Sequence, residues 1–159
     1  MKLRIGHSMD VHQLVPNRPL ILGGIEIPHE KGLLGHSDAD CVLHAITEAI
    51  IGALALGDIG THFPDTDPQY KDVNSKTLLE ETVKMMENHG YQVNNVDCTI
   101  YAERPKMAPY IPKMRQVIAQ LLKTNIDNVN IKATRGEKMG FIGREEGIGS
   151  EAVILLIKH

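Results

Sequence analysis

The sequence has few aromatic residues and only two cysteines. Four tyrosines, two phenylalanines and no tryptophan mean that aliphatic side chains and methionine must fill most of the core. Cys41 and Cys98 do not form a C-x-x-C pair, which favours free, buried thiols in a reducing compartment over a disulfide framework. The longest apolar run, residues 49–56, contains Gly52 and is far shorter than the roughly 20 residues that cross a bilayer. We therefore expect no membrane partner.

An excess of basic charge is also absent. Seventeen Lys and Arg residues against twenty Asp and Glu residues give a net charge of −3, so no broad positive field attracts nucleic acid. The first residues lack the apolar stretch of a signal peptide. At 159 residues, with 42% hydrophobic and 23% charged residues, the composition indicates a single domain over residues 1–159 of a cytoplasmic protein.

Short predicted strands alternate with predicted helices. Strands are indicated at residues 3–7, 20–22, 25–27, 96–101, 129–133 and 152–157. Helices are predicted from a start capped at Ser37 to Gly57, from a cap at Ser75 to Gly90, and over residues 112–123. Residues 61–74 and 135–149 are interpreted as loops. Because Gly23-Gly24 makes a hairpin, the sheet is not purely parallel, and we predict an α+β fold with one mixed sheet and about three helices on one face.

The predicted strand at residues 152–157 is apolar at every position. Such a strand is expected to be covered on both faces, and three helices can cover only one of them. The second face is therefore expected to pack sheet-to-sheet against neighbouring copies in a cyclic assembly.

Histidines are concentrated near the N-terminus, where six of the eight lie within the first 62 residues. In an extended strand Asp10 and His12 face the same side, and a carboxylate with an imidazole is a natural pair of Zn²⁺ ligands. His44, in the first predicted helix, could complete a site of three ligands. The alternative is that His44 is a hydrogen-bonded histidine of the core.

Two further segments have both a functional and a structural interpretation. His36 and Ser37 precede a helix start, where backbone N–H groups attract phosphate, although Ser37 could simply cap the helix. The acidic segments 58–60 and 63–67 could bind sugar hydroxyls or form solvated turns.

Residues 134–144 join a strand end to a glycine-rich loop that carries Arg135, Lys138 and Glu137. Basic groups and backbone N–H donors suit phosphate oxygens, and the Glu137 carboxylate suits a divalent ion. The segment matches neither the P-loop nor the dinucleotide-binding motif. The pattern therefore indicates a phosphate ligand without naming a reaction.

Taken together, segments 6–12, 32–44, 57–68, 105–107 and 132–150 resemble the 2-C-methyl-D-erythritol 2,4-cyclodiphosphate synthase family over essentially the whole chain. The resemblance implies a zinc-dependent homotrimer with active sites between subunits, acting in non-mevalonate isoprenoid biosynthesis. The implied substrate is 4-diphosphocytidyl-2-C-methyl-D-erythritol 2-phosphate. Its 2-phosphate attacks the β-phosphorus, CMP leaves, and a cyclic diphosphate remains.

The resemblance also implies roles for individual residues. Asp10, His12 and His44 correspond to zinc ligands, and Glu137 to the ligand of a Mg²⁺ or Mn²⁺ ion. Catalytic roles are implied for His36, Thr134 and Arg135. The implied substrate-binding residues are Asp10, His12, His36, Ser37, Asp58, Ile59, Gly60, Phe63, Pro64, Asp65, Thr66, Asp67, Ala102, Pro105, Lys106, Met107, Ala108, Thr134, Arg135, Gly136, Glu137, Phe141 and Arg144.

One segment departs from the family pattern. The family usually has two or three hydroxyl residues after a Lys-Ala pair, one of them regarded as a transition-state stabiliser, whereas here Thr134 is followed by Arg135 and Gly136. Arg135 could supply charge instead, or backbone N–H groups could suffice. Two rival functions are a metal-dependent phosphohydrolase with a water nucleophile and a trimeric nucleotide-binding regulator, which would leave Asp10, His12 and His44 without a purpose.

Overall fold

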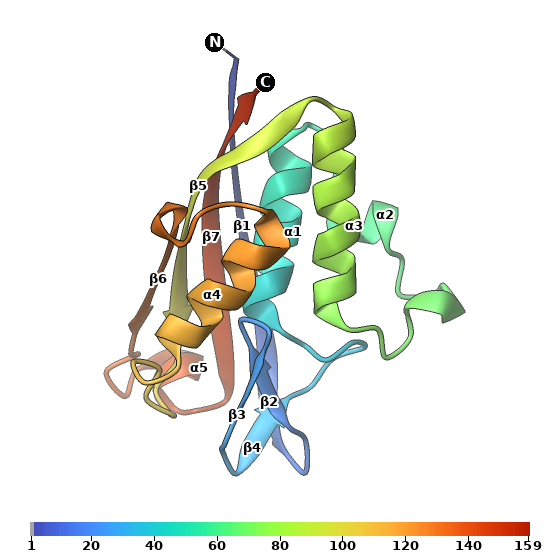
Figure 1. The fold of residues 1–159 in the computed structure, drawn as a ribbon. Helices are drawn as coiled ribbons and strands as arrows, with labels where there is room; N and C mark the ends of the chain where they lie inside the picture. The colour runs from blue at the N-terminus through green and yellow to red at the C-terminus, as the bar shows by residue number, and fades with distance from the viewer. Residues whose placement is uncertain (1) are drawn as a thin grey trace.

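A five-stranded mixed sheet forms the body of the computed structural model, which describes residues 2–159 (Figure 1). Its strands are β1 (Leu3–Pro16), β4 (Lys31–Leu33), β5 (Tyr91–Tyr101), β6 (Val129–Thr134) and β7 (Gly147–Lys158). In the order β4-β1-β7-β5-β6, all neighbours are antiparallel except β5 and β6, which are parallel. The α+β class and the mixed sheet are confirmed.

The expectation of a single sheet is wrong. The predicted hairpin forms as β2 (Leu20–Leu22) and β3 (Ile25–Ile27), but these strands pair only with each other in a separate two-stranded sheet. Gly23 and Gly24 at its turn donate backbone hydrogen bonds to the Asp40 carboxylate, at 3.0 and 2.7 Å. These bonds hold the turn against the start of a helix instead of extending the main sheet.

Three long helices lie on one side of the sheet, as expected (Figure 1). They are α1 (Cys41–Ala53), α3 (Ser75–Asn88) and α4 (Ile111–Leu122). The segment predicted as a loop at residues 135–149 contains the one-turn helix α5 (Gly140–Gly143). The one-turn helix α2 (Ile59–His62) overlaps the start of the other predicted loop, residues 61–74, which also contains the 3₁₀ turn η1 (Pro68–Tyr70). A second 3₁₀ turn, η2 (Ile126–Asn128), precedes β6. Helix α1 ends at Ala53 and not at Gly57, because Ala55 adopts a left-handed backbone with φ 59°.

The two predicted serine caps are also wrong. Asp40 caps α1, and its carboxylate accepts from the backbone N–H groups of Val42 and Leu43. Asn74 caps α3 by accepting from Lys76 N–H. Ser37 instead accepts from Ala39 N–H, so the serine signal was one turn too early for α1.

Replacing Asp40 with alanine is expected to lower the free energy of unfolding by about 2–4 kcal/mol. The change removes a helix cap and leaves buried N–H groups of the hairpin turn unpaired. Asp40→Asn should cost less, because an amide oxygen in place of Oδ1 can still accept from Gly23, Val42 and Leu43, and only the hydrogen bond from Gly24 N–H to Oδ2 is lost. Urea unfolding of the two variants measures both effects, and equal stabilities would contradict this role for Asp40.

Helix α1 approaches β1 very closely because of one glycine. A Cβ atom added at Gly6 would lie 1.8 Å from the carbonyl oxygen of Ala49, so only glycine fits there. This packing holds the second half of α1 directly against β1, the strand that also carries Asp10 and His12.

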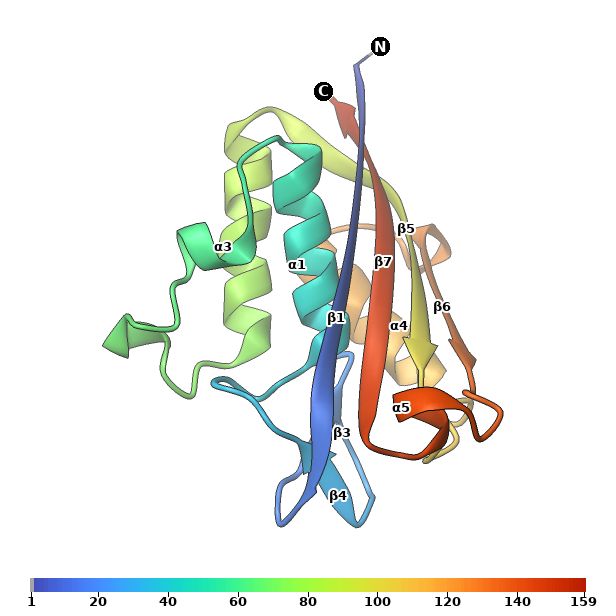
Figure 2. The same cartoon turned by 180° about the vertical axis from the view of Figure 1, so that it is seen from behind.

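Apart from its lower end, where α5 lies against β7, the opposite face of the sheet is not covered by another helix or strand of residues 2–159 (Figure 2). Along β7, Ala152, Ile154 and Leu156 are buried beneath the helices, whereas Val153 is 41% exposed on the open face. Ile5 of β1 is 71% exposed there, opposite Leu155 in the register of the sheet. Within one chain, therefore, the apolar strand at residues 152–157 is covered on one face only.

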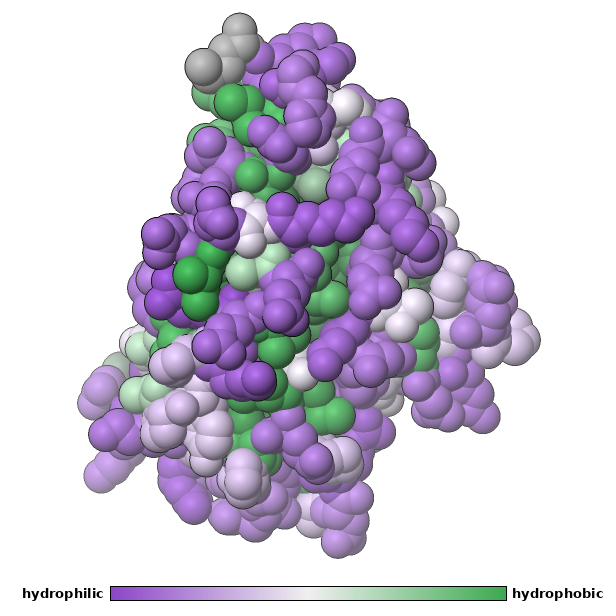
Figure 3. Space-filling model, in the orientation of Figure 1, coloured by the Kyte–Doolittle hydropathy of each residue, from purple (hydrophilic) through white to green (hydrophobic). Residues whose placement is uncertain are grey.

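The helical face is largely hydrophilic, with hydrophobic side chains visible in the furrow between α3 and α4 (Figure 3). Cys41 and Cys98 are buried free thiols, as expected from the sequence. Among residues 2–159, no helix has the length and hydrophobicity needed to cross a bilayer.

Candidate active site

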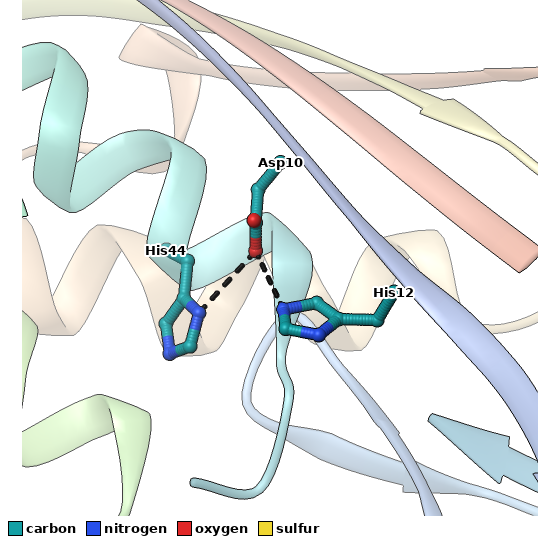
Figure 4. Close-up of side chains that lie close together, drawn as sticks. All are labelled: Asp10, His12 and His44. Carbon is teal, nitrogen blue, oxygen red and sulfur yellow. Dashed lines mark hydrogen bonds and ion pairs between the residues drawn. The ribbon is translucent and has the colours of Figure 1, made fainter. Parts of the chain in front are cut away.

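Strand β1 and helix α1 bring Asp10, His12 and His44 together (Figure 4). The His12 Nε2 atom lies 2.9 Å from Asp10 Oδ2, and His44 Nδ1 lies 3.3 Å from the same oxygen. One potential ligand atom from each of the three residues lies within 4.8 Å of the other two. Asp10 and His12 therefore face the same side of β1, as predicted, and α1 places His44 beside them.

The charges of this cluster are coupled. Burial opposes the charged form of Asp10, but hydrogen bonds and charge from His12 and His44 outweigh burial and lower the pKa of Asp10 to about 2. Burial would also lower the pKa of His12, but the hydrogen bond and charge of Asp10 raise it above the usual value. A carboxylate that favours a proton on the neighbouring His12 imidazole is a site where a metal cation can take the place of that proton.

The donor set fits a transition-metal ion. One carboxylate and two imidazoles match the ligands of catalytic Zn²⁺ sites, which keep a fourth position open. His12 Nδ1 lies 2.9 Å from the carbonyl oxygen of Leu34, so a proton on Nδ1 leaves Nε2 free for a metal. In the part of the chain that the structure describes, this triad is the only cluster of three such groups, and Glu137 is not part of it.

A cavity of about 360 Å³ adjoins the triad. The residues proposed from the sequence that line it are Asp10, His12, His36, Ser37, His44, Ile59, Gly60, Phe63, Pro64, Asp65 and Thr66. Sequence reasoning missed Tyr70, Val73 and Leu78, which also line it. Tyr70 contacts Phe63 edge-to-face, with 5.4 Å between the ring centroids. An aromatic residue is unusual in so polar a segment, and this feature could have identified Tyr70 from the sequence.

Two proposed binding residues do not line this cavity. Asp58 caps α2, accepting from the N–H and hydroxyl of Thr61 at 3.0 and 2.8 Å. Asp67 caps η1 by accepting from Gln69 N–H. Their carboxylates shape the segment that forms the cavity wall. Another residue missed from the sequence, Glu48, anchors the start of α2 by accepting from Ile59 N–H at 3.3 Å.

A second cavity, of about 680 Å³, lies where the parallel strands β5 and β6 end. The predicted residues that line it are Ala102, Pro105, Lys106, Met107, Ala108, Thr134 and Arg135. Gly136, Glu137, Phe141 and Arg144 lie in the following segment and line neither cavity. One chain thus holds the two groups of predicted residues in separate cavities.

Glu103 organises the loop beside the second cavity. Its carboxylate accepts from Arg135 Nε at 3.0 Å and from Lys138 N–H at 3.1 Å. The Glu103 side chain is only 6% exposed, whereas Arg135 is 60% exposed. These hydrogen bonds lower the pKa of Glu103, the one from Lys138 N–H most, so the loop is tied to a carboxylate that stays charged.

Comparison with known proteins decides the family. Residues 3–157 match the YgbB family. This chain belongs to the YgbB family. It is 58% identical over 156 residues to the 2-C-methyl-D-erythritol 2,4-cyclodiphosphate synthase of Desulfitobacterium hafniense (strain DSM 10664 / DCB-2), a match that covers 98% of this chain and 99% of the relative. It is 59% identical over 155 residues to the Bacillus mycoides (strain KBAB4) protein of the same name, covering 98% of each.

Solved structures of YgbB-type proteins have the same fold. The bifunctional IspDF from Campylobacter jejuni superposes with a TM-score of 0.95 at 39% identity, covering 99% of this chain and 43% of that one. A 2C-methyl-D-erythritol-2,4-cyclodiphosphate synthase in its CDP-bound form gives a TM-score of 0.90 at 33% identity, covering 97% and 100%. The family resemblance drawn from the sequence motifs is confirmed.

Proposed function

We propose that this protein converts 4-diphosphocytidyl-2-C-methyl-D-erythritol 2-phosphate into 2-C-methyl-D-erythritol 2,4-cyclodiphosphate and CMP. The observation that carries the proposal is the Asp10–His12–His44 cluster at a cavity lined by His36 and Ser37. Relatives that align over nearly their full length bear the name of this synthase, and a CDP-bound structure shares the fold.

The reaction is an internal phosphoryl transfer. An oxygen of the 2-phosphate forms a bond to the β-phosphorus, and the bond from that phosphorus to the bridging oxygen breaks. CMP leaves with the electron pair. Because the nucleophile is already an anion on the same molecule, the protein needs orientation and charge neutralisation, and no strong general base.

The proposed metals and residues divide these tasks. Asp10, His12 and His44 would hold Zn²⁺, and Glu137 would hold Mg²⁺ or Mn²⁺; bound cations would supply charge neutralisation for the phosphate oxygens. His36 and Ser37 contact the reacting phosphates. The other predicted residues of the first cavity receive the methylerythritol part, with Asp58 and Asp67 fixing the shape of its wall.

The second cavity is proposed to bind cytidine and the diphosphate through residues 102–108 and Thr134. Since the two cavities are separate in one chain, a neighbouring subunit would bring its second cavity to the metal cluster. The open apolar face of the sheet supports such an assembly, and we propose a homotrimer with active sites between subunits.

Arg135 is proposed to stabilise charge on the reacting phosphorus, with Glu103 holding its guanidinium in place. Arg135→Ala should lower kcat by about a hundredfold and change KM much less, since it removes a donor used mainly in the transition state. Arg135→Thr should recover part of the rate, and Lys123→Ala, which removes a surface charge paired with Glu87, should not change it. An Arg135→Ala enzyme as fast as the parent would assign Arg135 to the solvated loop.

Incubation with the authentic substrate tests the proposed function. ³¹P NMR should show the cyclic diphosphate, and chromatography should show one CMP for each product formed. A substrate that stays intact with the zinc-loaded protein in the presence of Mg²⁺ or Mn²⁺ would contradict the proposal.

A further inference from the structure

The far nitrogen of His44 is held by a serine from another helix. His44 Nδ1 faces Asp10, while Nε2 lies 2.8 Å from Ser75 Oγ and 3.2 Å from Ser37 Oγ. Ser75 is the first residue of α3 and is fully buried. Since Asn74 caps that helix, the Ser75 hydroxyl is not used for capping. Its contact with His44 therefore calls for another explanation.

A carboxylate fixes the direction of this hydrogen bond. Ser75 Oγ is also hydrogen-bonded to Asp38 Oδ1, and Asp38 Oδ2 accepts from Ser75 N–H at 3.0 Å. An ionised carboxylate can only accept, so the Ser75 hydroxyl donates its single proton to Asp38. The Ser75 oxygen must then accept from His44 Nε2–H. With Nε2–H held in this hydrogen bond, Nδ1, which faces Asp10 and His12, is the ring nitrogen available to a metal ion.

Asp38 is itself held rigidly. Its Oδ1 accepts from Asp40 N–H at 3.1 Å, immediately before α1, which carries His44. The carboxylate thus joins the start of α1 to the start of α3. His12 has a comparable arrangement, since Leu34 carbonyl oxygen lies 2.9 Å from its Nδ1.

We propose that Asp38 and Ser75 are positioning residues that hold His44 in the Nε2–H tautomer and so prepare the metal site. This inference rests on the proposed metal cluster and deepens it. Partners of metal-binding histidines that orient the ring affect metal affinity by about 10–100-fold when they are mutated. The structure places a serine between the histidine and the carboxylate in this role.

Four variants test the hydrogen-bonded chain His44–Ser75–Asp38, called the relay below. Ser75→Ala removes the acceptor for Nε2–H, and Ser75→Thr restores a hydroxyl. Asp38→Asn keeps the shape of the side chain but replaces one oxygen, which accepts hydrogen bonds, with an amide N–H₂ group, which can only donate them. The matched control is Thr82→Ala, which removes another buried hydroxyl of α3, one that donates to Leu78 carbonyl oxygen at 2.8 Å and does not contact His44.

The readouts are zinc affinity, measured by competition with a chelating dye, and ¹⁵N NMR of the histidine rings in metal-free protein. Ser75→Ala should weaken zinc binding by about 10–100-fold and shift His44 away from the Nε2–H tautomer. Asp38→Asn should weaken it by a smaller factor, because an amide oxygen in place of Oδ1 can still accept from the Ser75 hydroxyl. Ser75→Thr should retain most of the affinity, and Thr82→Ala should bind zinc as the parent does.

The outcomes separate the relay from the metal site. If Ser75→Ala binds zinc as tightly as the parent, or if Thr82→Ala weakens binding equally, the relay is wrong and the metal site stands. A folded Ser75→Ala protein whose His44 keeps the parent tautomer would also overturn the relay. A parent protein that binds no zinc would overturn the metal site and the relay with it.

Discussion

Replacing His44 with alanine is expected to remove the bound metal and to slow CMP release by about a thousandfold or more. The change deletes one of three ligands, and a catalytic metal supplies several kcal/mol of stabilisation to transition-state charge. His44 lies on α1, where alanine favours the helix, so the fold should persist. Metal analysis gives the zinc content, and a discontinuous CMP assay gives the rate.

His89→Ala is the matched control for His44→Ala. His89 lies at the end of α3, where its Nδ1 contacts the carbonyl oxygen of Met85 at 2.8 Å, away from the metal cluster. This variant should keep one zinc per chain and the parent rate. If His44→Ala keeps both, or if the parent keeps full activity after thorough chelation, the triad does not hold the catalytic metal.

Placing a charge on the open face of the sheet is expected to dissociate the proposed homotrimer. Ile5 is 71% exposed in the single chain, so Ile5→Asp puts no buried charge into the isolated fold. In an assembly that covers this face, each copy would bury an unpaired carboxylate, which should weaken association by about 4 kcal/mol, or roughly a thousandfold. Light scattering should give about three chain masses for the parent and one for the variant.

Activity should fall together with the mass of Ile5→Asp, because the two cavities would no longer meet. Ile126→Asp is the control, since Ile126 is 38% exposed on η2 and does not lie on the sheet. It should leave both mass and rate unchanged. A monomeric Ile5→Asp protein with the full parent rate would refute the shared active site.

Features of the fold that depend on neighbouring residues could be predicted from the sequence. A pattern within a few residues is enough to predict the Gly23-Gly24 turn, the helix start at Pro112 and the strand alternation around Cys98. The separate hairpin sheet could not be predicted, because it depends on Asp40 reaching Gly23 across 17 positions. Helix ends failed for a similar reason: the apolar pattern continues past Ala53, but the backbone turns at Ala55.

In the candidate site, too, contacts between residues close in the sequence could be predicted and contacts between distant residues could not. The pairing of Asp10 with His12 follows from strand geometry alone, whereas their contact with His44 depends on how Gly6 lets α1 approach β1. The contacts of Glu103 with Arg135 and of Ser75 with His44 could not be predicted, because the partners are 32 and 31 positions apart in the chain.

The most direct test of the proposed reaction is turnover in H₂¹⁸O. If the tethered 2-phosphate is the nucleophile, the cyclic diphosphate should form with one CMP and carry no ¹⁸O by mass spectrometry. If water is the nucleophile, as in a metal-dependent phosphohydrolase, ¹⁸O will appear in a phosphate product and no cyclic compound will form. That second result would contradict the proposed function.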